Sequence, residues 1–173
     1  MGGAFSVNVF EKISLWLRAR VASAPVHAVL VSPLFEEFSS SEVQLVLRLG
    51  RIVEMKKDAW IVRQGDYGAS MFMVLNGAAS VELADLQLKG PCVMQHIVEG
   101  DVFGEVSVVD PGLRSAGVKA ETAIRLIEYD ETALRKLQDS FPRIACQLCF
   151  NIARILAQRL AATNTKIGSA CRA

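Results

Sequence analysis

Two side chains of opposite charge, Glu105 and Arg114, stand nine positions apart in an otherwise apolar stretch of the sequence. The guanidinium of Arg114 offers a permanent charge and a planar fork of donors, which suits a phosphate group. The ionised carboxylate of Glu105 accepts hydrogen bonds and suits the hydroxyls of a sugar. Gly104 precedes a short predicted helical turn, where a glycine lets backbone N–H groups approach an anion. A phosphate with a sugar hydroxyl nearby describes a nucleotide-like ligand.

The same two residues have a simpler interpretation. Glu105 and Arg114 could form an ion pair at the rim of a barrel, which is the usual role of a glutamate and an arginine in a sheet.

The segment that contains these residues has the pattern of short strands. From Arg51 to Tyr129, apolar segments are interrupted by turn-forming residues about every ten positions, which predicts a compact sandwich or barrel built from hairpins. The interruptions are Lys57-Asp58, Gly65-Asp66, Asn76-Gly77, Gly90-Pro91, Gly100-Asp101 and Asp110-Pro111-Gly112.

Helical periodicity appears on both sides of the strands. We expect an amphipathic helix over Val7–Ser23 and a second over Ser39–Leu49, with Gly50 as a left-handed cap. A short helix is predicted over 131–138, and Pro142 begins a long one. The buried face of the second helix is predicted to consist of Val43, Val46 and Leu47.

These elements predict an α+β fold with a β-barrel or jelly-roll core of about eight antiparallel strands, flanked by N-terminal helices and a long C-terminal helix. We divide the chain into an N-terminal helical extension (1–30), a β-roll (31–141) and a C-terminal helix (142–173).

Residues 103–120 resemble the phosphate-binding cassette of the cyclic nucleotide-binding domain family. Further segments resemble this family in the same order, which makes the resemblance specific. They are Pro33-Leu34-Phe35, Arg63-Gln64-Gly65-Asp66, Met73-Val74-Leu75-Asn76-Gly77, Glu99-Gly100-Asp101 and the closing helix.

The resemblance implies a 3′,5′-cyclic monophosphate as ligand. Glu105 would accept a hydrogen bond from the ribose 2′-hydroxyl, Arg114 would pair with the cyclic phosphate, and Gly104 and Ser115 would donate from backbone or hydroxyl groups. The cassette residues expected to contact the ligand are Phe103, Gly104, Glu105, Val106, Ser107, Arg114, Ser115 and Ala116.

Three positions depart from the family pattern. Leu113 stands where proline is frequent, Ser107 where alanine is common, and Gly117 where a larger side chain often lies beside the purine. The departure at Gly117 concerns affinity for the base.

Within the last predicted helix, residues 158–167 are similar to the equivalent helix of the catabolite activator type within this family. Thr163 and Asn164 fall where that type contacts adenine, and both side chains can donate and accept. Their alternative role is that of polar residues near a helix end. Cyclic AMP is therefore favoured over cyclic GMP, which stays possible because Ser115 could satisfy a guanine amine.

The same helix is the dimer seam in the catabolite activator type. The resemblance implies a homodimer through residues 142–167 and a switch in helix position that signals to a partner protein. No helix-turn-helix follows within this sequence, so we expect no direct DNA binding. The expected seam consists of Ala145, Cys149, Ile152, Leu156, Thr163 and Ile167.

Composition limits the class of protein. Of the 173 residues, 51% are hydrophobic and 21% charged, which is typical of a globular domain, and the net charge of +1 provides no field for a polyanion. No apolar run is long enough to span a membrane. Four cysteines without a secretory signal indicate reduced thiols and a cytoplasmic protein; they are Cys92, Cys146, Cys149 and Cys171.

Three alternatives were weighed against the nucleotide sensor. A metal-dependent enzyme with a cupin barrel lacks ligands, because the chain has two histidines, His27 and His96; we expect neither enzyme activity nor a metal. A redox or metal sensor would use Cys146 and Cys149, although a cluster needs four ligands. A ligand-free interaction scaffold would keep the fold, but the intact Glu105 and Arg114 argue against it.

Overall fold

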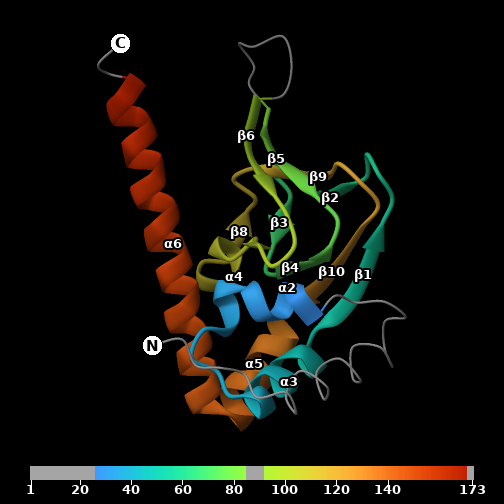
Figure 1. Ribbon diagram of the computed structural model, residues 1–173, viewed down its shortest axis with the longest axis vertical. Coiled ribbons are helices and arrows are strands. Elements are labelled where there is room, and N and C mark those ends of the chain that lie inside the picture. The colour runs from blue at the N-terminus through green and yellow to red at the C-terminus, as the bar shows by residue number, and fades with distance from the viewer. Residues whose placement is uncertain (1–25, 85–91, 171–173) are drawn as a thin grey trace.

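The computed structural model describes residues 26–84 and 92–170 of the chain, so the helix expected over Val7–Ser23 lies outside the described residues. A roll of short strands occupies one side of the molecule, and helices pack at its base and along its flank (Figure 1). The α+β class expected from the sequence is confirmed.

The strands form two four-stranded antiparallel sheets and one two-stranded sheet. The sheet orders are β1-β10-β4-β7, β2-β9-β5-β6 and β3-β8. About eight strands were expected and the described residues form ten; β3, β7 and β8 are each two residues long, which is too short to produce an apolar pattern. The bounds are β1 Arg51–Met55, β2 Trp60–Val62, β3 Tyr67–Gly68, β4 Met71–Asn76, β5 Ala79–Leu83, β6 Cys92–Ile97, β7 Val102–Phe103, β8 Gly112–Leu113, β9 Gly117–Ala120 and β10 Ile124–Tyr129.

Strand β4 separates two hydrophobic cores. Its residues Met71, Met73 and Leu75 are fully buried among the helices, whereas Phe72 and Val74 face the interior of the roll. Successive side chains of a strand point to opposite faces, so a strand buried on both faces needs an unbroken apolar run. Strand β10 also contributes to both cores, with Ile127 among the helices and Leu126 inside the roll.

Helices cover the outer face of the first sheet. Ser39 caps α3 (Ser40–Leu49), and its hydroxyl and the Glu42 carboxylate form a capping box. Gly50 was expected to adopt a left-handed conformation and instead has φ −77°; a Cβ there would lie 2.4 Å from Cγ1 of Ile127, so the glycine provides room rather than a turn. The bounds are α2 Val26–Val31, η1 Pro33–Phe35, α3 Ser40–Leu49, α4 Val106–Val109, α5 Glu131–Ser140 and α6 Pro142–Ala170.

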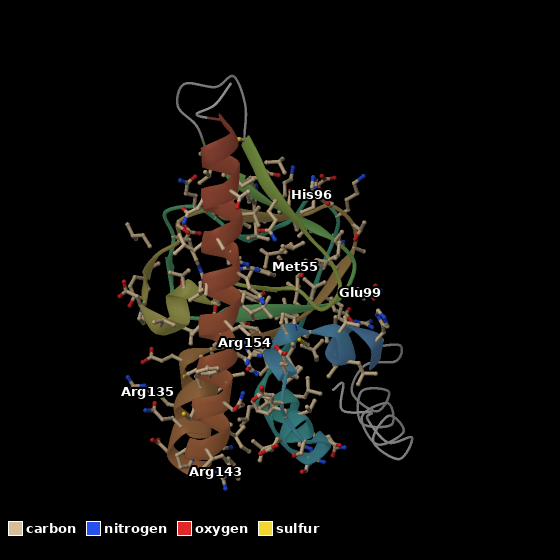
Figure 2. The ribbon with its side chains drawn as sticks, turned by 60° about the vertical axis from the view of Figure 1, so that its left-hand side comes forward. Met55, His96, Glu99, Arg135, Arg143 and Arg154 are labelled. Carbon is tan, nitrogen blue, oxygen red and sulfur yellow. The ribbon has the colours of Figure 1, made fainter. Side chains whose placement is uncertain are left out.

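The first half of α6 docks on η1 through buried polar contacts. The amide of Asn151, which is 1% exposed, donates to the carbonyls of Leu34 at 2.9 Å and Glu36 at 2.8 Å. One turn further, Arg154 forms ion pairs with Glu36 and Glu37. Figure 2 shows Arg154 partway along α6 and Arg143 near its start. None of the helices in the described part of the chain has the length and apolar character needed to cross a membrane.

Candidate functional site

The cassette begins where β7 ends. Gly104 follows with a φ of +74°, a conformation that side chains rarely adopt. A Cβ at this position would lie 2.8 Å from both Nη1 of Arg114 and the carbonyl oxygen of Ser70. Glu105 then takes the N-cap position of the short helix α4. The glycine thus permits both the turn and the close approach of Arg114.

Arg114 is a buried cation with neutral partners. It is 7% exposed; its Nη1 donates to the Ser107 hydroxyl at 2.9 Å and its Nη2 to the Ser70 hydroxyl at 3.0 Å. None of the ion pairs found within residues 26–84 and 92–170 includes Arg114. Burial lowers the pKa of this guanidinium, an effect that the charges of Glu128 and Glu105 partly oppose. An anion beside it would supply the missing counter-charge.

The two-stranded sheet holds Arg114 in place. The backbone N–H of Arg114 donates to the Asp66 carbonyl at 2.8 Å, and the carbonyl of Arg114 accepts from the N–H of Gly65 at 2.9 Å. A Cβ on Gly68 would lie 2.2 Å from Nε of Arg114, so β3 passes directly over the side chain. The conformation of the arginine is therefore set by β3 as well as by the cassette.

Glu105 is 4% exposed and pairs with a residue outside the cassette. Its Oε1 accepts from Nη1 of Arg159 on α6, and Nη2 of the same guanidinium donates to the Val102 carbonyl. The simpler interpretation, an ion pair between Glu105 and Arg114, is wrong, because each has other partners. Arg159 was missed by sequence analysis, although it lies one helical turn before Thr163, a spacing that places both residues on one face.

A cavity of about 170 Å³ lies between the cassette and strands β2, β5, β6 and β9 of the roll. The eight cassette residues expected to contact a ligand all line it, as does Arg159. Thr163 and Asn164 do not; both are exposed, and the Thr163 hydroxyl donates to the Arg159 carbonyl at 2.9 Å. The structure thus brings the cassette residues together without Thr163 and Asn164, and contact with a ligand stays a prediction for all ten.

The three departures from the family pattern have different structural consequences. Ser107 supplies the hydroxyl that accepts from Arg114. Leu113 is exposed at the edge of the cavity. Gly117 does not line the cavity; a Cβ there would lie 2.6 Å from the Trp60 ring, so this glycine accommodates an aromatic side chain of β2.

The histidines and cysteines form no centre within the described residues. His96 pairs with Glu121 at 2.8 Å on the surface, and no group of three or more His, Cys, Asp and Glu side chains gathers there as a metal site. Cys146 and Cys149 are exposed on α6, and partial desolvation of the Cys149 thiol, together with the neighbouring Cys146, raises its pKa. Cys171 lies outside the described residues.

The expected dimer seam needs a correction. Ile152 is 1% exposed, and Ala145 and Leu156 pack against the same core, so three of the residues assigned to the seam contribute to the core of the protomer. The residues of α6 that are exposed at alternating spacings of four and three are Cys146, Phe150, Ala153, Ala157 and Leu160; we call them the outer stripe.

Comparison with known proteins gives a family match over the roll. The family model described as "Cyclic nucleotide-binding domain" matches residues 52–141, which is more than half of the chain.

Relatives and solved structures extend this likeness. A "CRP-like cAMP-activated global transcriptional regulator" from Mycobacterium tuberculosis is 26% identical over 141 residues, which are 78% of this chain and 58% of the relative. The Thermus thermophilus catabolite activator protein superposes with a TM-score of 0.72 at 26% identity, covering 81% of this chain and 63% of that one. A cyclic nucleotide-binding domain from Methylobacillus flagellatus gives a TM-score of 0.74 at 21% identity, over 92% and 84%. This chain therefore spans little more than half the length of the curated relative.

Proposed function

Since the chain belongs to the cyclic nucleotide-binding domain family, we propose that it is a sensor that binds a 3′,5′-cyclic nucleotide and passes the signal to a partner protein. The observation that carries the proposal is Arg114, a buried cation with neutral partners at the wall of the cassette cavity. Such a charge is costly until an anion reaches it, and this position is the one that the family uses for phosphate.

In the proposed complex the cyclic phosphate lies between Arg114 and the turn at Gly104. The hydroxyls of Ser70 and Ser107 can rotate and leave the guanidinium free to form charge-assisted hydrogen bonds with the phosphate. The buried carboxylate of Glu105 would accept from the ribose 2′-hydroxyl. Nothing in this arrangement breaks a bond, so we propose a binding module with no catalytic activity of its own.

We favour cyclic AMP over cyclic GMP as the ligand. The names of several relatives describe cAMP-activated regulators, and Thr163 and Asn164 can both donate and accept toward an adenine edge. Both side chains are exposed and lie away from the cavity, so contact with the base requires α6 to move or a second chain to approach.

Calorimetric titration of the chain with cyclic AMP and cyclic GMP tests the proposal. Arg114→Leu removes the charge from a buried phosphate site and should weaken binding by at least about a hundredfold. Arg143→Leu is the control, because Arg143 is exposed near the start of α6 and does not line the cavity (Figure 2). Saturable binding that Arg114→Leu leaves unchanged, or no binding by the wild type, would contradict the proposal.

The signal would pass through α6, which contributes Arg159 to the cavity wall. A ligand shifts a two-state equilibrium by its difference in affinity for the two states, and a tenfold change needs about 1.4 kcal/mol. We expect cyclic AMP to change hydrogen exchange over residues 142–167. Unchanged exchange in that range at saturating ligand would show that the helix is not the switch.

We also propose that two chains pair through α6 along the outer stripe. Its spacing of four and three residues matches a coiled-coil seam, and its alanines allow close approach of two helices. Phe150 and Leu160 are 62% and 63% exposed, which leaves apolar surface for a partner helix to cover. The cytoplasmic location is a proposal from the sequence.

A further inference from the structure

We infer that Cys146 and Cys149 form a dithiol that a small disulfide oxidises to an internal bridge in the first half of α6. The two cysteines lie three positions apart in this helix, and both are exposed. The inference assigns a modification site outside the cassette cavity, and it does not depend on a bound nucleotide.

The geometry of a helix brings the two cysteines within reach of each other. Residues i and i+3 share a face, with Cα atoms about 5 Å apart, and a disulfide joins Cα atoms that are about 4.4–6.8 Å apart. The pKa of Cys149 is raised by partial desolvation and by the charge of Cys146, so the two sulfur atoms are close enough to interact. The pair therefore needs no cysteine from another element to form a bridge.

A groove beside the pair gives a small disulfide access to both thiols. It has a volume of about 830 Å³, and both cysteines line it together with Val108 of α4 and Leu134 and Gln138 of α5. Within residues 26–84 and 92–170, both cysteines are free thiols and belong to no metal site. Both sulfur atoms are therefore available for reaction.

The reaction is a thiol–disulfide exchange in two steps. The Cys146 thiolate attacks one sulfur of a small disulfide such as glutathione disulfide, which forms a mixed disulfide and releases one small thiolate. The Cys149 thiolate then attacks the sulfur of Cys146, which forms the internal bridge and releases the second small thiolate. The two cysteines are oxidised, the small disulfide is reduced to two thiols, and these thiols take up the two protons that the cysteines lose.

The order of the two attacks follows from the surroundings of Cys149. Partial desolvation and the charge of Cys146 both raise the pKa of Cys149, so its thiolate forms less readily while Cys146 is ionised. When Cys146 carries a mixed disulfide, that charge is gone and Cys149 ionises more easily. Cys146 therefore attacks first, and Cys149 is the resolving residue.

The bridge changes the helix that contains it. Cβ atoms three positions apart in a helix are about 5–6 Å apart, whereas a disulfide holds them about 3.5–4.5 Å apart, so the turn must tighten. This turn includes Leu148, which is 2% exposed, and Gln147, whose amide donates to the Asn151 side chain at 3.1 Å. Asn151 in turn holds α6 to η1. We expect the bridge to loosen the contact between the first half of α6 and η1.

Peptide mapping of the chain after equilibration in glutathione buffers tests the inference. Cleavage after Arg143 and Arg154 releases peptide 144–154, which contains Cys146 and Cys149 and no other cysteine. After incubation of the folded chain with excess glutathione disulfide and trapping with a maleimide, most of this peptide should carry an internal disulfide and no maleimide. Excess reduced glutathione should restore two thiols that react with maleimide.

Serine variants separate the roles of the two cysteines. Cys149→Ser should accumulate glutathione on Cys146, because the resolving thiol is missing, whereas Cys146→Ser should leave Cys149 mainly reactive toward maleimide. Cys92→Ser is the matched control, since Cys92 lies on β6 and does not line the groove. It should form the bridge as readily as the wild type does.

Hydrogen exchange measures the effect of the bridge on α6. Amides of residues 144–151 should exchange at least about threefold faster in the bridged wild type than in its dithiol form. Glutathione disulfide should leave exchange in the double variant Cys146→Ser/Cys149→Ser unchanged. Equal exchange in the bridged and dithiol forms would contradict the effect on α6.

Other outcomes overturn the inference. Peptide 144–154 with two reactive thiols, or with glutathione on both cysteines, after equilibration with excess glutathione disulfide would show that the pair does not close. Two copies of the peptide joined through Cys146, the first residue of the outer stripe, would place the bridge between two chains instead of within one helix. These results leave nucleotide binding untouched, because the titration of Arg114→Leu tests it separately.

Discussion

The side chain of Arg114 is suited to bind an anion, because its neighbours accept hydrogen bonds from the guanidinium without neutralising its charge. Two hydroxyls accept from its terminal nitrogens, and the ring of Phe72 lies 6.0 Å from its guanidinium carbon. Hydroxyls compensate a buried charge less well than a carboxylate does, so part of the desolvation cost is left for the ligand to offset. Their rotation costs little, so the site needs no large rearrangement to accept a phosphate.

A methyl group on Gly68 tests this placement of Arg114. Its Cβ would lie 2.2 Å from Nε, so we expect Gly68→Ala to displace the guanidinium and weaken cyclic nucleotide binding at least about tenfold. Calorimetry measures the affinity, and circular dichroism checks that the variant is folded.

The control for this substitution is Gly112→Ala. Gly112 pairs with Gly68 in the β3-β8 sheet, but a Cβ there would meet nothing closer than 3.9 Å. We expect its affinity to be close to that of the wild type. Equal affinities in both alanine variants would show that Arg114 does not depend on β3.

At this scale, sequence analysis found the residues that lie together in the chain. The cassette supplies Glu105, Arg114 and their neighbours within a short segment, and the structure places all of them at one cavity. Sequence analysis missed Ser70, which lies 44 positions from its partner Arg114, and Arg159, which lies 54 positions from its partner Glu105. Contacts of that range depend on how the roll and α6 pack, which no local motif records.

Among the elements, α6 connects the N-terminal helices to the cassette. Its first half is fixed to η1 through Asn151, and its second half supplies Arg159 to the cavity. The buried carbonyl of Leu34 and the partly buried carbonyl of Glu36 both accept a hydrogen bond from the amide of Asn151. A helix held at one end and in contact with the ligand site further along is suited to pivot when that site fills.

Removal of the Asn151 amide should loosen this attachment. We expect Asn151→Ala to lower the free energy of unfolding by about 2–3 kcal/mol, because it leaves two carbonyls without a donor. Urea unfolding of the unliganded protein measures it. The control is Asn164→Ala on the same helix, where the side chain is exposed and the change should stay within about 0.5 kcal/mol. Similar stabilities of the two variants would show that α6 does not depend on this contact.

The elements themselves were largely predicted by periodicity and capping residues. The second helix ends at Leu49 as expected, and the three residues assigned to its buried face are buried. Gly50 was misinterpreted, because a glycine after a helix has two uses: a left-handed turn or the absence of a side chain. Here Ile127 and Tyr129 occupy the space that a side chain would need, and this depends on tertiary packing that the local sequence does not record.

In the molecule as a whole, α6 has two apolar stripes that lie in different environments. One contains Leu148, Ile152 and Ile155 and packs into the protomer, whereas the outer stripe is exposed. Periodicity alone could not assign them, because both follow spacings of three and four. Arg159 lines the cavity and Leu160, the next residue, lies on the outer stripe. One turn of helix thus borders both the ligand site and the proposed seam, so a ligand that moves this turn would also change the pairing of two chains.

The seam is tested by placing a charge at Leu160, the last residue of the outer stripe. We expect Leu160→Glu to raise the dissociation constant of a homodimer at least about tenfold, because apolar burial is lost and two carboxylates approach each other across the helix pair. Analytical ultracentrifugation over a range of concentrations measures it.

Gln158→Glu adds the same charge at an exposed position of α6 outside the outer stripe and should leave the dissociation constant nearly unchanged. Phe150→Glu, ten residues earlier on the stripe, should act like Leu160→Glu if the helices run parallel along their length. A wild type that sediments as a monomer throughout, or stripe variants that pair as tightly as Gln158→Glu, would assign the exposed apolar face of α6 to a different protein instead of a second copy of this chain.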